Sequence, residues 1–257
     1  MLGSSDLPRN LKLTLAYDGY DFAGWQVQPD RPTIQGALVS AIEHLTGEKT
    51  LPQGSGRTDA GVHALAQVAT VAIESPIPTG NLRKALNDLL PPAIRVLAIE
   101  EAKADFHARR CARAKTYRYR ILRDELCPPF LARYVYHHPY PLDEERMIAA
   151  APVVVGEHDF TSFAAVDPES RKEGLEINNV RTIYSSQWTR EGSELIYTVR
   201  GNGFLHHMVR NLVGTFMMVG KGSLDVAGLR RILELRDRSA AAATAPASGL
   251  FLVSVEY

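Results

Sequence analysis

Apolar residues follow two kinds of spacing along the first part of the chain. Alternation of apolar and polar residues, as in Leu11, Leu13 and Leu15, is typical of a half-buried strand, and apolar residues three to four apart are typical of a helix. These spacings predict strands at 11–15, 66–73 and 94–98, and helices at 34–45 and 82–89. Thr33 is placed to cap the first helix and Gly47 to end it. A further short strand at 49–53 would complete the order strand, helix, two strands, helix, strand.

The second part of the chain repeats this order. The pattern predicts strands at 115–122, 180–188, 195–200 and 250–255, and helices at 142–155, 206–219 and 225–235. The order is that of ferredoxin-like folds and of RNA-recognition modules. We therefore expect an α+β fold with two such halves, 1–104 and 105–257, sharing a continuous, mainly antiparallel sheet around a central cleft. The order of elements supports this, and no sequence identity between the halves does.

Two stretches of the second half show no clear period. Asp167 to Asn178 is polar and is predicted to be a mobile loop. Residues 240–247 are low in complexity. They are either a plain linker or, given their place before the last strand, a segment packed near the cleft.

Composition indicates a folded, soluble protein, with 45% hydrophobic and 23% charged residues. No apolar run is long enough to cross a bilayer, and the first residues do not have the pattern of a signal peptide, so we expect a cytoplasmic protein without a membrane segment. The two cysteines, Cys111 and Cys127, suggest free thiols rather than a disulfide framework or a zinc site.

The overall charge gives no attraction for a polyanion, because 29 basic residues balance 29 acidic ones. One local stretch is strongly basic and is interleaved with Tyr117 and Tyr119. Its cations are Lys103, Arg109, Arg110, Arg113, Lys115, Arg118, Arg120 and Arg123, against Asp105 alone. Such a stripe suits phosphate contacts beside a stacking platform. Equally, it suits a solvated strand face balanced by acidic neighbours.

A glycine-rich loop at 54–64 carries one aspartate, Asp59, between two predicted strands. Glycine permits close backbone approach, so the loop is suited to presenting this carboxylate. Spacing alone favours a plainer interpretation, a tight turn in which Asp59 bonds its own backbone. The loop has neither the Gly-Lys-Ser/Thr of a phosphate loop nor the third glycine of a dinucleotide fingerprint.

The loop also resembles the signature of the TruA family of tRNA pseudouridine synthases. Further motifs fall in the order of that family and cover nearly the whole chain. They are Tyr17-Asp18-Gly19, Gly24-Trp25-Gln26-Val27-Gln28, Phe106-His107-Ala108-Arg109, Tyr117-Arg118-Tyr119, Asp159-Phe160-Thr161-Ser162-Phe163, His206-His207-Met208-Val209-Arg210-Asn211 and Gly249-Leu250-Phe251.

The resemblance implies site residues that the pattern alone does not assign. It makes Asp59 the nucleophile, Arg210 its ion-pair partner, Tyr117 the residue packed against the target base, and Arg57 a candidate for holding the flipped-out nucleotide. The strand pattern does not separate Tyr117 from Tyr119. Periodicity alone favours an Arg210 whose side chain extends to solvent. Without the resemblance, Arg57 would be interpreted as an arginine on the surface of a loop.

The implied function is isomerisation of uridine to pseudouridine at positions 38, 39 and 40 of the tRNA anticodon stem-loop, by a homodimer without a cofactor. The histidine pairs at 137–138 and 206–207 lack metal-ligand spacing, so no metal site is expected. One alternative is a non-catalytic RNA-binding module of paired recognition folds. Another is an N-glycoside hydrolase, for which no second carboxylate stands out. The attack of Asp59 on C1′, its attack on C6 and a glycal route all stay open.

Overall fold

The structure, a computed structural model, describes residues 8–165 and 178–257. The loop predicted at 167–178 lies, apart from Asn178, outside the described residues. The chain divides into two compact units, Met1–Arg113 with Leu252–Tyr257, and Ala114–Phe251. The expected halves, 1–104 and 105–257, stay a prediction. Within the described ranges the chain has ten strands in a mainly antiparallel sheet, which confirms the predicted α+β class.

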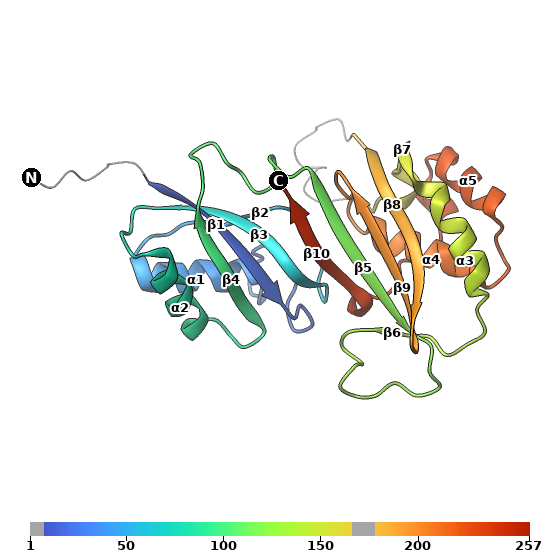
Figure 1. Ribbon diagram of the computed structural model, residues 1–257, viewed down its shortest axis with the longest axis horizontal. Helices are drawn as coiled ribbons and strands as arrows, with labels where there is room; N and C mark the ends of the chain where they lie inside the picture. The colour runs from blue at the N-terminus through green and yellow to red at the C-terminus, as the bar shows by residue number, and fades with distance from the viewer. Residues whose placement is uncertain (1–7, 166–177) are drawn as a thin grey trace, which may run out of the picture. The chain divides into compact units, whose positions relative to one another are not determined.

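The first unit contains four complete strands, part of a fifth and two helices (Figure 1). Its elements are β1 (Arg9–Tyr17), α1 (Ile34–Thr46), β2 (Gln53–Gly54), β3 (His63–Ile73), α2 (Thr79–Leu89) and β4 (Ile94–Glu101). The strands lie in the order β4-β1-β3, with β2 beside β3 and every pair antiparallel. This is the ferredoxin-like order that the sequence predicts.

Local sequence fixes the first helix as predicted. The Thr33 hydroxyl accepts a hydrogen bond from the Gly36 N–H at 3.1 Å, and Gly47 ends the helix in the left-handed conformation, with φ 74°. The predicted strand at 49–53 is wrong except for its last residue. Pro52 has no N–H for a strand ladder, and its carbonyl instead accepts from the Gln35 side chain at 2.8 Å.

The second unit contains most of the remaining elements. They are β5 (Ala114–Leu122), β6 (Tyr136–His137), α3 (Glu144–Ala150), β7 (Gly156–Asp159), β8 (Val180–Glu191), β9 (Glu194–Gly201), α4 (Met208–Gly220) and α5 (Val226–Leu235). The strand order is β5-β9-β8-β7. The last strand, β10 (Leu250–Glu256), gives its first two residues to this unit and the others to the first.

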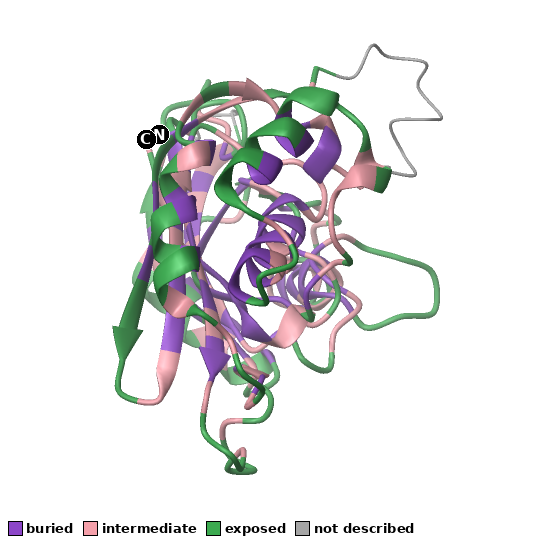
Figure 2. Cartoon of the chain, turned by 90° about the vertical axis from the view of Figure 1, so that its right-hand side faces the viewer, coloured by how far each residue is buried: buried purple, intermediate pink, exposed green. Residues whose placement is uncertain are grey.

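Helices of the second unit cover one face of its sheet. Phe216 of α4 packs on Trp188 and Tyr197, with ring centroids 6.0 and 5.2 Å apart. Most residues of α4 are buried. In Figure 2, where buried residues are purple, a largely purple helix lies between the other helices and the strands. None of the helices in the described parts of the chain is both long enough and apolar enough to cross a membrane.

Two predicted helices are shorter than expected. The helix predicted at 142–155 ends at Ala150 and continues as a 3₁₀ turn (Ala151–Val154), because Pro152 interrupts the α-helical hydrogen bonds. The helix predicted from His206 begins at Met208, since His207 has a φ of 58° and cannot be part of a right-handed helix. Strands β6 and β7 were not predicted, because two and four residues are too few to show a period.

His138 gives the second unit a predicted sensitivity to acid. Its ring is buried between Tyr136 and Tyr140, with centroids 5.6 and 5.4 Å away. Burial, then the nearby charges of Lys221 and Arg123, lowers the pKa of His138 below its ordinary value of 6.5. Below that pH the unfolded chain takes up a proton that the folded protein does not, so stability falls as the pH falls further.

We therefore expect His138→Phe to lose less stability than the wild type between pH 7.5 and 5.5. The measurement is the free energy of unfolding in urea at intervals across that range. An identical acid response in both proteins would show that His138 does not cause the effect.

Candidate active site

The loop that carries Asp59 is fastened to the first unit by buried side chains. The Gln67 amide donates to the Gly56 carbonyl at 3.0 Å and to the Tyr17 hydroxyl at 3.3 Å. The Tyr17 and Thr58 hydroxyls share a hydrogen bond, 2.9 Å long. Burial raises the pKa of Tyr17 to about 12, so its hydroxyl keeps its proton at neutral pH. The residue before Asp59 is thus held by a buried network.

Main-chain contacts fix the same loop from the other side. The Trp25 N–H donates to the Thr58 carbonyl at 3.0 Å, and Gly24 lies against this bond with a φ of 96°. A Cβ on Gly24 would lie 2.6 Å from the Thr58 oxygen. A Cβ on Gly19 would lie 1.9 Å from the Val62 oxygen. Glycine at both positions lets two segments approach more closely than any other residue would permit.

Asp59 itself is half-buried and lies in a turn. Its carbonyl accepts a hydrogen bond from the Val62 N–H at 3.1 Å. A main-chain turn is therefore present at Asp59, and a bond from the Asp59 side chain to its own backbone stays a prediction. Arg57, two residues earlier, is exposed. Both residues belong to the first unit.

The two tyrosines of β5 differ in their surroundings, although they share one face as predicted. Tyr119 is fully buried, and its hydroxyl donates to the Pro246 carbonyl at 2.8 Å. Burial raises the pKa of Tyr119, so this donor also stays neutral. Tyr117 is 7% exposed and packs edge-to-face on Phe204, with centroids 4.9 Å apart. The structure thus gives Tyr119 a structural task, a distinction that the strand pattern does not make.

Arg210 lies on α4 and is bound to the alanine-rich segment at 240–247. Its Nε donates to the Ala245 carbonyl at 2.8 Å, and its own carbonyl accepts from the Ala245 N–H at 3.2 Å. Arg210 is half-buried, so it does not extend freely to solvent as periodicity alone suggests. A Cβ on Gly214 would lie 2.1 Å from the Ala243 oxygen, so the segment packs directly on the helix. The alternative of a plain linker is wrong.

Asn211, next to Arg210, binds the same segment through its side-chain amide. Its fully buried amide donates to the Phe163 carbonyl at 2.7 Å. The amide oxygen accepts from the Thr244 hydroxyl at 2.7 Å and from Arg238 at 3.1 Å. The guanidinium of Arg210 is therefore positioned by both its helix and the segment that Asn211 anchors.

The four predicted site residues fall two in each unit. Asp59 and Arg57 belong to the first, and Tyr117 and Arg210 belong to the second. Each pair has the local support described above. The ion pair between Asp59 and Arg210 stays a prediction.

The basic stripe is partly neutralised. Arg120 makes two hydrogen bonds to Glu194, at 2.7 and 2.6 Å, and Arg123 is paired with Glu144 at 3.0 Å. For these cations the interpretation as a balanced strand face is correct. Arg118 differs, since its Nε is buried and lacks a hydrogen-bond partner among the described residues.

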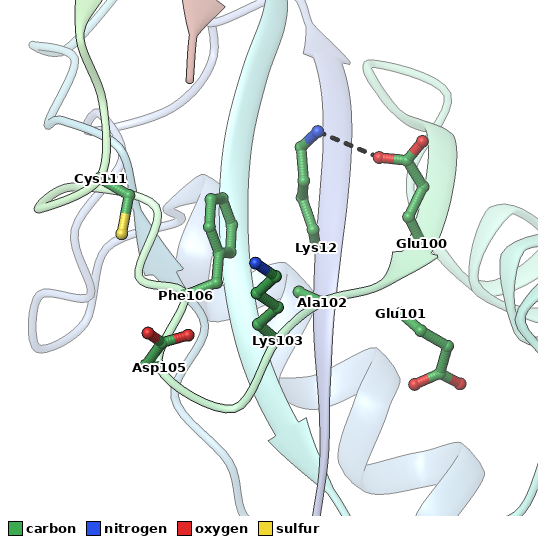
Figure 3. Close-up of a pocket in the computed structure, with 8 residues that line it drawn as sticks. All are labelled: Lys12, Glu100, Glu101, Ala102, Lys103, Asp105, Phe106 and Cys111. Atoms are coloured by element: carbon green, nitrogen blue, oxygen red, sulfur yellow. Dashed lines mark hydrogen bonds and ion pairs between the residues drawn. The ribbon is translucent and has the colours of Figure 1, made fainter.

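A surface pocket of the first unit includes the start of the stripe but not Asp59 (Figure 3). Its lining consists of Lys12, Glu100, Glu101, Ala102, Lys103, Asp105, Phe106 and Cys111. Lys12 is paired with Glu100 at 3.0 Å. Three carboxylates against two ammonium groups do not favour a phosphate, so this pocket is not a candidate for the reaction site.

Sequence reasoning missed the residues that support the loop, Tyr17, Gln67 and Trp25. A signal was present for Gln67, which is with Thr70 one of two polar residues in the mainly apolar strand predicted at 66–73. A buried polar side chain needs partners, and those partners are the loop residues. The supporting role of Tyr17 depends on a contact 41 residues along the chain, which a local pattern does not reveal.

Comparison with known proteins gives consistent matches. The family model described as tRNA pseudouridine synthase matches residues 14–109 and 150–257, which include Arg57, Asp59 and Arg210. The chain is 57% identical over 249 residues to the tRNA pseudouridine synthase A of Solibacter usitatus, covering 97% of this chain and 100% of that protein. It is 46% identical to the tRNA pseudouridine synthase A of Brevibacillus brevis, with 97% of this chain and 100% of that protein covered. It is 45% identical to the protein of the same name from Lacticaseibacillus casei, with 96% of this chain and 98% of that protein covered.

Proposed function

Since the chain belongs to the tRNA pseudouridine synthase family, we propose that it converts uridine to pseudouridine at positions 38, 39 and 40 in the anticodon stem-loop of tRNA. The observation that carries this proposal is the anchored loop that presents Asp59, in a chain matched over nearly its full length to proteins named for this reaction. The alternative of a non-catalytic RNA-binding module has no use for such a loop.

The reaction is an isomerisation and needs no oxidant, reductant or nucleotide. The bond between N1 of uracil and C1′ breaks, the base turns, and C5 bonds to C1′. C5 loses a proton and N1 gains one, so the atoms balance without a cofactor. The residues must therefore supply a nucleophile, a charge partner and a surface for the detached base.

We assign these tasks as the family resemblance implies. Asp59 is the nucleophile, and it acts as the carboxylate. Arg210 favours that ionised form by pairing with it, a role supported by the fixed position of its Nε on Ala245. Tyr117 packs on the uracil, and Arg57 holds the flipped-out nucleotide from its exposed place in the loop. We further propose that the enzyme is cytoplasmic and, as the family resemblance implies, works as a homodimer, which would enlarge the surface available to tRNA.

The test is to incubate the protein with an unmodified tRNA transcript that carries uridines at 38–40, with no metal or nucleotide added. Pseudouridine is then mapped by mass spectrometry after a label specific for it. We expect pseudouridine at these positions and no free uracil. Release of uracil would indicate the hydrolase, and RNA binding without any product would indicate the binding module.

A further inference from the structure

One face of the second unit's sheet lies opposite the helices. We define the open face by two neighbouring rows of paired residues across β5, β9 and β8. The rows are Arg118, Thr198 and Gln187, and Thr116, Arg200 and Ser185. Residues paired across neighbouring strands point to the same side of a sheet. Tyr117, Tyr197 and Trp188 point to the other side, where Phe216 of α4 packs on Trp188 and Tyr197.

Arg118 is the unusual residue of the open face. It is half-buried, and its buried Nε has no hydrogen-bond partner among residues 8–165 and 178–257. Arg120, two residues along the same strand, shows the usual solution, a two-bond pairing with Glu194. A buried N–H without an acceptor is costly, and a guanidinium is shaped to bind a carboxylate or a phosphate through two parallel bonds.

The two rows contain hydrogen-bonding side chains and no acidic residue. Thr198 is paired with Arg118 across β5 and β9, and Gln187 is paired with Thr198 across β9 and β8. The Arg200 guanidinium lies over the ring of Tyr184, 4.9 Å from its centroid, and Tyr184 is 45% exposed. Cations, neutral donors and an exposed aromatic ring on an open sheet are the chemistry of single-stranded and loop RNA recognition.

We propose that Arg118 binds a phosphate of the RNA at the open face, with Thr198 and Gln187 beside it. The assignment of the anion to RNA rests on the proposed function, since a tRNA is the polyanion that this protein meets. The site is separate from the site residues proposed above, because Arg118 points to the side of β5 opposite Tyr117.

The experiment measures tRNA affinity at several salt concentrations for the wild type, Arg118→Gln and Arg118→Lys. One lost phosphate contact lowers the slope of log affinity against log salt by about 1 and weakens binding about tenfold at 0.1 M salt. Arg118→Gln should show both changes, and Arg118→Lys should restore most of the slope. Arg146→Gln is the control, since Arg146 is exposed on α3 and paired with Asp143.

Two RNAs locate the contact, the full tRNA transcript and its isolated anticodon stem-loop. If Arg118→Gln weakens binding of both RNAs, the phosphate lies in the anticodon arm. If it weakens binding of the full tRNA alone, the phosphate lies elsewhere on the tRNA. An unchanged salt slope in a folded Arg118→Gln protein would overturn the proposal. A changed sedimentation coefficient with unchanged RNA affinity would also overturn it, because the anion would then be a carboxylate of a second copy.

The proposal and the proposed function fail in different ways. If the wild type makes no pseudouridine but Arg118→Gln still lowers the salt slope for tRNA, the function is wrong and the phosphate site stands. If pseudouridine forms and the slope does not change, the function stands and the phosphate site is wrong.

Discussion

Asp59→Asn will fold and bind tRNA like the wild type, and it will make no measurable pseudouridine. An amide has the shape of the carboxylate but lacks its charge and is a far weaker nucleophile. The side chain is half-buried in a turn that is fixed by Gln67, Gly24 and the main chain of Asp59, so the substitution leaves the loop in place. We expect turnover to fall at least about 10⁴-fold, the scale seen when a nucleophile is removed.

The matched control is Asp88→Asn, which makes the same chemical change at an exposed position of α2 in the same unit. It should retain full activity. The measurement is the initial rate of pseudouridine formation with tRNA in excess, with the melting temperature and tRNA affinity recorded for each variant. Turnover in folded Asp59→Asn at a tenth of the wild-type rate or more would remove Asp59 from the role of nucleophile.

Gly24→Ala will reduce turnover by about 100-fold while most of the protein stays folded. Alanine at a φ of 96° is strained, at a cost of roughly 1–3 kcal/mol. Its Cβ would also lie 2.6 Å from the Thr58 oxygen and 3.1 Å from the Asp59 carbonyl carbon. Both contacts are with main-chain atoms, so the loop must shift, and a displacement of about 1 Å at a reacting group costs on the order of 100-fold.

Gly80→Ala is the control for Gly24→Ala. Gly80 lies in α2, and a Cβ there would meet no atom within 4 Å, so alanine fits and improves the helix. Comparison of kcat with tRNA affinity separates the two effects of Gly24→Ala. If stability falls and kcat does not, the contact at Gly24 supports the fold and does not position Asp59.

The sequence predicts best what short-range interactions decide. The first helix begins after Thr33 and ends at Gly47 because the cap and the stop each act within a few residues. The position of Asp59 in a loop before β3 follows equally from the local glycines and from the periodicity of the strand predicted at 66–73. The network of Tyr17, Gln67 and Thr58 does not, since its members meet only after the sheet has formed.

The second unit shows why other features escaped prediction. Periodicity places Arg210 at the edge of an apolar stripe, where an arginine usually extends to water. Its actual partner, Ala245, lies 35 residues away in a segment without any period of its own. The conformation of His207 also escaped prediction, because nothing in its sequence neighbours indicates a positive φ.

The segment at 240–247 has little capacity to determine its own conformation, because alanine side chains offer neither hydrogen bonds nor much buried area. Its shape is supplied by α4 through Asn211, Thr215 and Gly214, and only Thr244 reaches back with a side-chain bond. In protein engineering, this makes the segment a place where activity can be tuned without touching the substrate. Replacement of Thr244 would remove its hydrogen bond to Asn211 and thereby loosen the contact of the segment with Arg210. A bulkier residue in place of Ala243 would instead press on α4, the helix that carries Arg210.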